Sequence, residues 1–161
     1  MAENPLIADE FRNKIGMEWE AGVYEVEKGM IQRFAQAIDD PNPLWQDEEY
    51  ARKSQYGSII APPTFIATIG GEQFGQKVIA PLFRDGLLHG STELECYQPI
   101  RPNDRITVTV KLTNIRERQG SQSGKMMFAT FDVTYKNQKD ELVARCQQIM
   151  IGYEPARAKY G

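Results

Sequence analysis

The residues of this chain whose types and spacing best suit chemistry lie in the segment AIDDPNPLWQDEEYA, residues 37–51. Asp40 is followed by an asparagine between two prolines and then by Trp45, an arrangement typical of an active-site loop. A carboxylate that acts as a general acid or base needs a second titratable group at the same water or substrate. The indole of Trp45 only donates hydrogen bonds and cannot carry a proton. His89, the only histidine of the chain, is the one imidazole that could serve instead.

Two short helices are expected to hold this loop. Apolar residues recur at helical spacing between residues 30 and 38, and Pro41 and Pro43 end that helix. Asp47 is a suitable N-cap for a second helix, which runs to about Lys53.

A third helix is predicted to begin at Pro63, because a proline fits the first helical turn, where a missing N–H costs little. It continues through the segment TFIATIGGEQF, in which Glu72 is the only charged residue. A helix that is apolar nearly all round is usually buried, so this one is expected at the centre of the fold.

From about residue 86 the hydrophobic period changes to two, which is typical of strands. Strands are predicted in four segments separated by loops of Pro, Gly, Asn and Asp: 87–100, 104–119, 124–137 and 141–153. Residues 17–26 are expected to add an edge strand. The sequence therefore predicts an α+β fold. A hot-dog arrangement, in which a long antiparallel sheet wraps around a central apolar helix, is one of the α+β folds that fit.

Composition and charge limit the function classes. The 161 residues, 41% hydrophobic and 25% charged, predict one globular domain over 1–161 with its core at about 10–153. The net charge of -3 gives no bulk attraction to nucleic acid or anionic membrane. No apolar run approaches the ~20 residues of a membrane helix, and the polar N-terminal segment lacks a signal-peptide core.

The two cysteines, Cys96 and Cys146, each fall in a strand pattern and are predicted to be buried free thiols. Free thiols indicate a reducing compartment, so a cytoplasmic protein is expected. The sequence contains no Cys/His cluster with metal-ligand spacing, so no metal site is predicted, and no cofactor is expected either.

Two segments resemble a known family. FAQAIDDPNPLWQDEEYARKSQYGSIIAPPTF, residues 34–65, resembles the motif region of the MaoC-like (R)-specific enoyl-thioester hydratases and dehydratases. LLHGSTELECYQPIRPNDRI, residues 87–106, is similar to the segment that follows in the N-terminal, FAS1-type dehydratase half of that family. The resemblance covers roughly residues 10–153 and implies a single hot-dog fold.

The family's catalytic half carries the motif D-x-N-P-x-H. The resemblance implies that its Asp and His hold one water against the double bond of an enoyl thioester, which is general acid–base catalysis. It also implies that a glycine N–H at the start of the central helix binds the thioester oxygen as negative charge develops there.

Asp40 falls on the aspartate of that motif, and Asn42 and Pro43 keep their places, but Trp45 falls where the histidine stands. Pro63 takes the place of the glycine and has no N–H to donate. The resemblance therefore implies a degenerate, non-catalytic half. A catalytic MaoC-like partner would supply Asp and His, and this chain would shape a pocket for an acyl thioester of coenzyme A or acyl carrier protein.

The residues expected to bind the substrate lie in the loop and in the helix that follows it. They are Asn42, Trp45, Tyr56, Ile60, Pro63, Thr64, Ala67 and Gly70. The small residues among them suit a tunnel for a long or bulky acyl group.

Three functions remain open. The first is an accessory acyl-binding subunit of a heteromeric (R)-specific 2-enoyl-CoA/ACP hydratase or (3R)-hydroxyacyl dehydratase. The second is a self-sufficient, homo-oligomeric enoyl-CoA hydratase that uses Asp40 with His89, and the third is a free-standing acyl-thioester-binding module. Hot dogs in this family pair edge to edge, so a dimer is predicted, and a homodimer if the partner is absent.

Simpler interpretations of single residues also remain open. Asp40 and Asn42 would then only cap helix ends and shape the turn. Trp45 would be a core or interface aromatic, and His89 a structural or interface residue.

Overall fold

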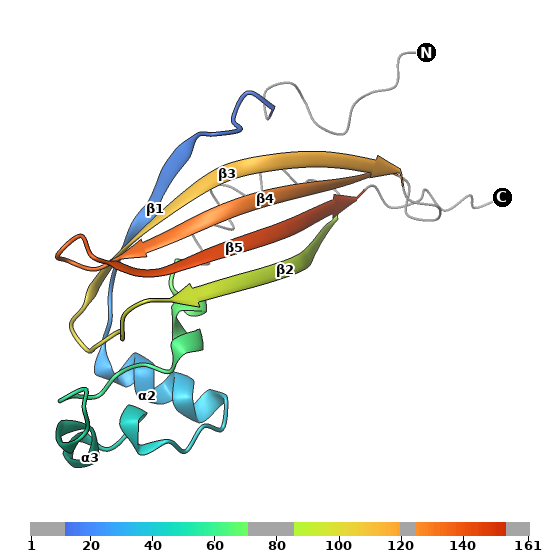
Figure 1. Ribbon diagram of the computed structural model, residues 1–161. Helices are drawn as coiled ribbons and strands as arrows, with labels where there is room; N and C mark the ends of the chain where they lie inside the picture. The colour runs from blue at the N-terminus through green and yellow to red at the C-terminus, as the bar shows by residue number, and fades with distance from the viewer. Residues whose placement is uncertain (1–11, 71–85, 120–124, 154–161) are drawn as a thin grey trace, which may run out of the picture.

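The main element of the chain is a five-stranded antiparallel sheet, in a computed structural model that describes residues 12–70, 86–119 and 125–153 (Figure 1). Its strands are β1 (Glu18–Glu25), β2 (Leu87–Cys96), β3 (Arg105–Gln119), β4 (Lys125–Lys136) and β5 (Leu142–Tyr153). The spatial order is β1-β3-β4-β5-β2, so β1 and β2 are the two edges. All four pairings are antiparallel, and the five predicted strands are confirmed.

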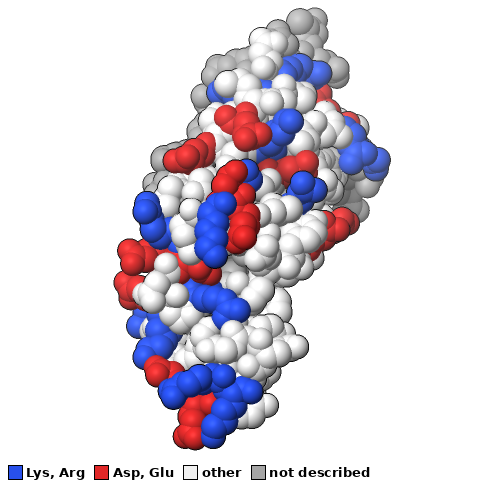
Figure 2. Space-filling view, turned by 60° about the vertical axis from the view of Figure 1, so that its left-hand side comes forward, with Lys and Arg blue, Asp and Glu red and all other residues white. Residues whose placement is uncertain are grey.

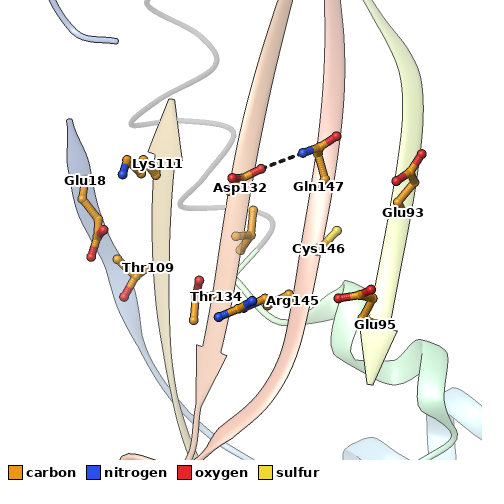
Figure 3. A pocket seen from close by; sticks show the side chains of 11 residues that line it. Glu18, Glu93, Glu95, Thr109, Lys111, Asp132, Thr134, Arg145, Cys146 and Gln147 are labelled. Atoms are coloured by element: carbon orange, nitrogen blue, oxygen red, sulfur yellow. Dashed lines mark hydrogen bonds between the residues drawn. The ribbon is translucent and has the colours of Figure 1, made fainter. Parts of the chain in front are cut away.

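The inner face of the sheet carries the apolar half of the predicted alternation. Val110 of β3 lies opposite Val133 of β4, and Leu112 lies opposite Phe131. All four are at most 3% exposed, because successive side chains of a strand point to opposite faces and these point into the core. The polar residues between them therefore cover the outer face, where Figure 3 draws several of them.

Three short helices pack together below one end of the sheet (Figure 1). They are α2 (Lys28–Ala37), the 3-10 helix η1 (Pro43–Trp45) and α3 (Glu48–Lys53). The apolar face of α2 buries Ile31 and Ala35 completely. Asp47 caps α3 as predicted, since its carboxylate accepts from the two backbone N–H groups of Glu49 and Tyr50.

The third helix differs from the prediction. In the described residues it is a short 3-10 helix, η2 (Pro63–Thr68), and Ile69 beyond it is extended. Gly70 follows with a φ of 81° and packs so closely on β3 that an added Cβ would lie 3.2 Å from a methyl of Val108. This turn toward the sheet ends the helical conformation earlier than the apolar pattern indicates. Residues 71–74 of the expected helix lie outside the described residues.

The helix η2 is also not buried all round. Phe65 and Ile66 are at most 1% exposed and belong to the core. The side chains of the opposite face are exposed: Pro63, Thr64, Ala67 and Thr68. An uncharged, exposed face of this kind is available to a ligand or a second protein.

The cysteines separate into two environments. Cys146 is 3% exposed, as predicted, but Cys96 is exposed, so its predicted burial is wrong. The reason is that β2 is an edge strand, which has a neighbour on one side only. Among the helices of the described ranges, none has the length and hydrophobicity needed to cross a membrane.

Candidate functional site

Asp40 and Trp45 form a direct hydrogen-bonded pair. The indole Nε1 of Trp45 donates to Oδ2 of Asp40 at 2.9 Å, and the backbone N–H of Asn42 donates to Oδ1 at 3.1 Å. Trp45 is 7% exposed and Asp40 is half-buried. Both carboxylate oxygens therefore accept from groups of the same loop.

The loop sequence explains this geometry. Asp39, with a φ of 53°, turns the chain directly after α2, and the N–H of Asp40 donates to the carbonyl of Ala35 at 2.9 Å. The side chain of Asn42 caps η1 by accepting from the N–H of Leu44 at 3.0 Å. The amide of Gln46 donates to the carbonyl oxygen of Asp40 at 3.0 Å. The loop is thus closed on itself by short-range hydrogen bonds, which fix the aspartate and the indole together.

This pair does not provide the two proton carriers that acid–base catalysis needs. An ionised carboxylate only accepts hydrogen bonds, and an indole N–H only donates one. A hydrogen bond from a neutral donor to an ionised carboxylate is stronger than one between two neutral groups. On its geometry, Asp40 orients Trp45.

Next to Trp45 lies a cavity of about 240 Å³ between η2 and the ends of two strands. Four of the predicted substrate-binding residues line it: Trp45, Tyr56, Ile60 and Pro63. The remaining lining is mainly apolar and comes from η2, the end of β2, the loop after it and the start of β5. These residues are Ala61, Pro62, Ile66, Cys96, Tyr97, Gln98, Pro99, Ile100, Val143 and Ala144.

The other predicted substrate-binding residues lie outside this lining. Asn42 shapes the turn before η1. Thr64 and Ala67 lie on the exposed face of η2, and Gly70 is buried against Val108. The structure therefore assembles part of the predicted set into one cavity and leaves the rest on a neighbouring surface or in the core.

His89 lies on a different part of the sheet. It is exposed on β2, opposite Met150 of β5, and its Nε2 lies 2.7 Å from Oγ1 of Thr92. Six residues of strand lie between His89 and Cys96 at the cavity, which corresponds to roughly 20 Å at the usual rise per residue. The described structure therefore does not bring His89 to Asp40.

Two further polar side chains of the cavity lie at the end of β2 and just beyond it, Cys96 and Tyr97, and the sequence analysis treated Cys96 only as a buried thiol. The thiol of Cys96 donates to the carbonyl oxygen of Pro63 at 3.7 Å, and partial desolvation of the sulfur raises the pKa of the thiol although the residue as a whole is exposed. The hydroxyl of Tyr97 donates to the carboxylate of Glu95, and this hydrogen bond raises the pKa of the phenol. The pairing of β2 with β5 would have placed these residues beside Ala144, but the period-two pattern alone does not reveal which strands are neighbours.

A larger hollow, of about 450 Å³, lies on the outer face of the sheet (Figure 3). All five strands contribute to it, from Glu18 on β1 to Glu93 and Glu95 on β2. Its side chains follow the strand register, and the amide of Gln147 donates to Asp132 at 3.0 Å within it. Such a mixed polar lining is that of a solvated sheet face and does not suit an apolar ligand, so we take the smaller cavity as the candidate site.

Charges of both signs are interspersed over the face drawn in Figure 2, without a broad area of one sign. Within the described parts of the chain, no group of three or more His, Cys, Asp and Glu residues could hold a metal ion.

A long antiparallel sheet in the order β1-β3-β4-β5-β2, with short helices packed at one end of it, is the arrangement of an α+β hot-dog protein. Residues 13–146 match the family model described as FAS1-like, dehydratase domain region, and the chain belongs to this family.

Relatives of known sequence agree with this assignment. A UPF0336 protein of Streptomyces avermitilis is 38% identical over 101 residues, which are 61% of this chain and 67% of that protein. A probable enoyl-CoA hydratase alpha subunit of Thermomonospora curvata is 25% identical over 145 residues, which are 81% of this chain and 46% of that protein.

Solved structures share the fold. The MaoC-like dehydratase from Rhodospirillum rubrum has a TM-score of 0.72 and 25% identity, over 88% of this chain and 94% of that one. A chain of the HadBC (3R-hydroxyacyl-ACP dehydratase) complex from Mycobacterium tuberculosis has a TM-score of 0.72 at 20% identity, over 86% and 97% of the two chains. The predicted hot-dog fold and the resemblance to the MaoC-like family are confirmed.

Proposed function

We propose that this chain is the accessory, acyl-binding subunit of a two-subunit (R)-specific 2-enoyl-thioester hydratase or (3R)-hydroxyacyl-thioester dehydratase. The Asp40–Trp45 hydrogen bond carries the proposal. At the position where a catalytic hot dog needs its histidine, this chain has an indole that uses the carboxylate as an acceptor. Pro63, at the start of η2, offers no N–H to a thioester oxygen.

The cavity beside Trp45 supports an acyl-binding role. Its lining is apolar, which suits a hydrocarbon chain, and it adjoins the exposed, uncharged face of η2. At about 240 Å³ it is smaller than a usual ligand pocket of roughly 300–1,000 Å³. We infer that a second hot dog adds the remaining walls and the catalytic Asp and His, and that the acyl thioester of coenzyme A or acyl carrier protein lies between the two.

The edge strand β2 is the surface on which this partner would pair. Leu87, Leu88 and Tyr97 are 43%, 50% and 49% exposed along or just beyond it. Its outer side has no neighbouring strand within the sheet, and an exposed edge of this kind readily accepts another strand. Similarity to a HadBC chain and to an alpha subunit of an enoyl-CoA hydratase favours a two-subunit enzyme. The free thiols of Cys96 and Cys146 favour a reducing, cytoplasmic compartment.

The test compares hydration of crotonyl-CoA and of a longer 2-enoyl-CoA by the purified chain, alone and with a hot-dog partner that carries D-x-N-P-x-H. We expect background activity alone and strong activity in the complex. An Asp→Asn change in the partner's motif should abolish that activity, whereas Asp40→Asn in this chain should largely preserve it in a complex that still assembles.

Two alternatives would give different results. Rapid turnover by the chain alone, lost in a folded His89→Ala variant, would favour the self-sufficient hydratase. Binding of acyl-CoA without any partner-dependent activity would favour a free-standing acyl-thioester-binding module.

A further inference from the structure

Arg101 lies in the turn between β2 and β3, close to the candidate cavity but not in its lining. Its side chain is half-buried. One guanidinium nitrogen, Nη1, donates to the backbone carbonyl of Tyr56 at 2.7 Å and also to Oγ of Ser58. Arg101 forms no ion pair among the described residues, so neutral oxygens of the 56–58 segment receive its charged hydrogen bonds.

Hydrogen bonds of the turn hold the backbone of Arg101 in place. The N–H of Arg101 donates to the carboxylate of Asp104 at 2.7 Å, which closes the turn. Asn103, with a φ of 70°, donates its N–H to the carbonyl of Val26 at 2.7 Å, and the N–H of Val26 donates to Asp104 at 2.8 Å. Val26 is 1% exposed, so the turn that carries Arg101 is fixed to the core.

The segment that Arg101 contacts has an irregular conformation. Residues 54–62 contain no helix or strand, and Gly57 has a φ of 69°. Within the described residues no backbone N–H donates to the carbonyl of Tyr56, which leaves Arg101 as its donor. Ser54 ties the near end, since it accepts from the N–H groups of Tyr56 and Gly57 at 3.1 Å, and backbone bonds from Ile60 and Ala61 tie the far end. Arg101 supplies the hydrogen bonds from a distant part of the chain that hold the middle of the segment, at Tyr56 and Ser58.

Tyr56 and Ile60 of this segment both line the cavity. We propose that Arg101 is a positioning residue: its guanidinium holds the Tyr56–Ile60 wall against the cavity and so sets the width available to an apolar acyl chain. This inference rests on the proposed function for the identity of the ligand, but not for the position of the wall. A hydrogen bond from a charged donor is strong enough for this purpose, and the planar guanidinium reaches both acceptors from one nitrogen.

The test uses Trp45 as a reporter, because it lines the same cavity. The chain has two tryptophans, so a Trp19→Phe background leaves Trp45 as the only one. In the free protein, Arg101→Ala should raise the quenching of Trp45 fluorescence by acrylamide at least twofold, with Arg101→Lys between parent and Ala. Arg105→Ala, which removes an exposed arginine four residues away, is the matched control and should leave quenching unchanged. All variants are measured at a temperature where circular dichroism shows them folded.

The second arm titrates dodecanoyl-CoA against the same variants and against the complex with the catalytic subunit, with coenzyme A alone as the blank. Arg101→Ala should weaken dodecanoyl-CoA binding roughly tenfold, the equivalent of one charged hydrogen bond, with Lys intermediate. If the parent binds the probe and Arg101→Ala changes neither quenching nor affinity, the positioning role is wrong. If Arg101→Ala changes the quenching but the parent protein binds dodecanoyl-CoA neither alone nor in the complex, the acyl-binding function is wrong and the positioning role stands.

Discussion

The indole nitrogen of Trp45 lies 2.9 Å from a carboxylate oxygen of Asp40, so the two residues that we propose to align with the histidine and aspartate of D-x-N-P-x-H are in direct contact. In the proposed alignment, a histidine at position 45 would be a second titratable group next to Asp40. The indole instead makes the aspartate a structural acceptor, which stabilises the loop between α2 and α3 and closes one side of the cavity.

The first prediction concerns the stability provided by this pair. Asp40→Ala leaves the indole N–H of a nearly buried Trp45 without its acceptor, so the free energy of unfolding should fall by about 1–3 kcal/mol. Asp40→Asn keeps one acceptor oxygen and should lose less, about 1 kcal/mol. Urea unfolding followed by circular dichroism measures both values.

Asp39→Asn is the matched control. Asp39 is exposed with a φ of 53°, a conformation that asparagine tolerates well. The free energy of unfolding of the Asp39→Asn variant should therefore stay within about 0.5 kcal/mol of the parent value. Equal stability of Asp40→Ala and the parent would contradict a structural role for the pair.

The sequence predicted the strands well because each one buries a single face, and period-two alternation records that burial directly. It also predicted the cap at Asp47, since the cap is a local interaction. The conformation at Gly70 was not predictable, because it depends on the close approach of Val108 from β3. The contact of Trp45 with Asp40 and the support from Arg101 were missed for related reasons: neither a side-chain orientation nor a contact between distant segments leaves a periodic pattern.

The second prediction concerns alkaline pH. Tyr135 is 3% exposed, and burial raises the pKa of its phenol above the ordinary value of 10.0. As pH rises past that value, the unfolded chain loses this proton before the folded chain does. The unfolded state is thereby favoured, so stability that is fully present below pH 10 should decline above it.

Urea unfolding between pH 8 and 11 measures this decline. Tyr135→Phe removes the buried phenol and should give a shallower loss of stability above pH 10 than the parent. Tyr50→Phe, which removes a phenol that is 52% exposed, is the control and should follow the parent curve. Identical curves for Tyr135→Phe and the parent would show that the buried phenol of Tyr135 does not cause the loss of stability at high pH.

The third prediction concerns assembly. A dimer or larger oligomer is expected, formed along the β2 edge, and a homodimer when the catalytic partner is absent. Leu88→Lys places a charge on this edge and should shift the protein toward monomer in multi-angle light scattering at micromolar concentration. Val23→Lys makes the same change on the opposite edge strand, at a residue that is 47% exposed, and should leave the oligomer intact. A monodisperse parent monomer, or equal dissociation by both variants, would overturn the prediction.

The last prediction tests the proposal that Trp45 and Pro63 replace two catalytic groups of the motif. Trp45→His puts an imidazole beside Asp40, yet we expect no measurable hydratase activity from this change alone. A thioester oxygen at the start of η2 would still meet Pro63, which has no N–H, and a missing oxyanion donor typically costs about 3–4 kcal/mol in the transition state. Because imidazole is smaller than indole, the substitution would also leave a partly filled cavity and lower the free energy of unfolding by about 1–3 kcal/mol.

The double change Trp45→His with Pro63→Gly restores both groups, so recovery of activity should appear there first. The two substitutions should be strongly non-additive, because a proton carrier and an oxyanion donor act on the same transition state. Steady-state hydration of crotonyl-CoA by both single variants and the double variant measures this, with Pro63→Gly alone as the control that should remain at background. Robust activity in the Trp45→His single variant would mean that another N–H binds the oxyanion and that Pro63 does not occupy the glycine position of the motif.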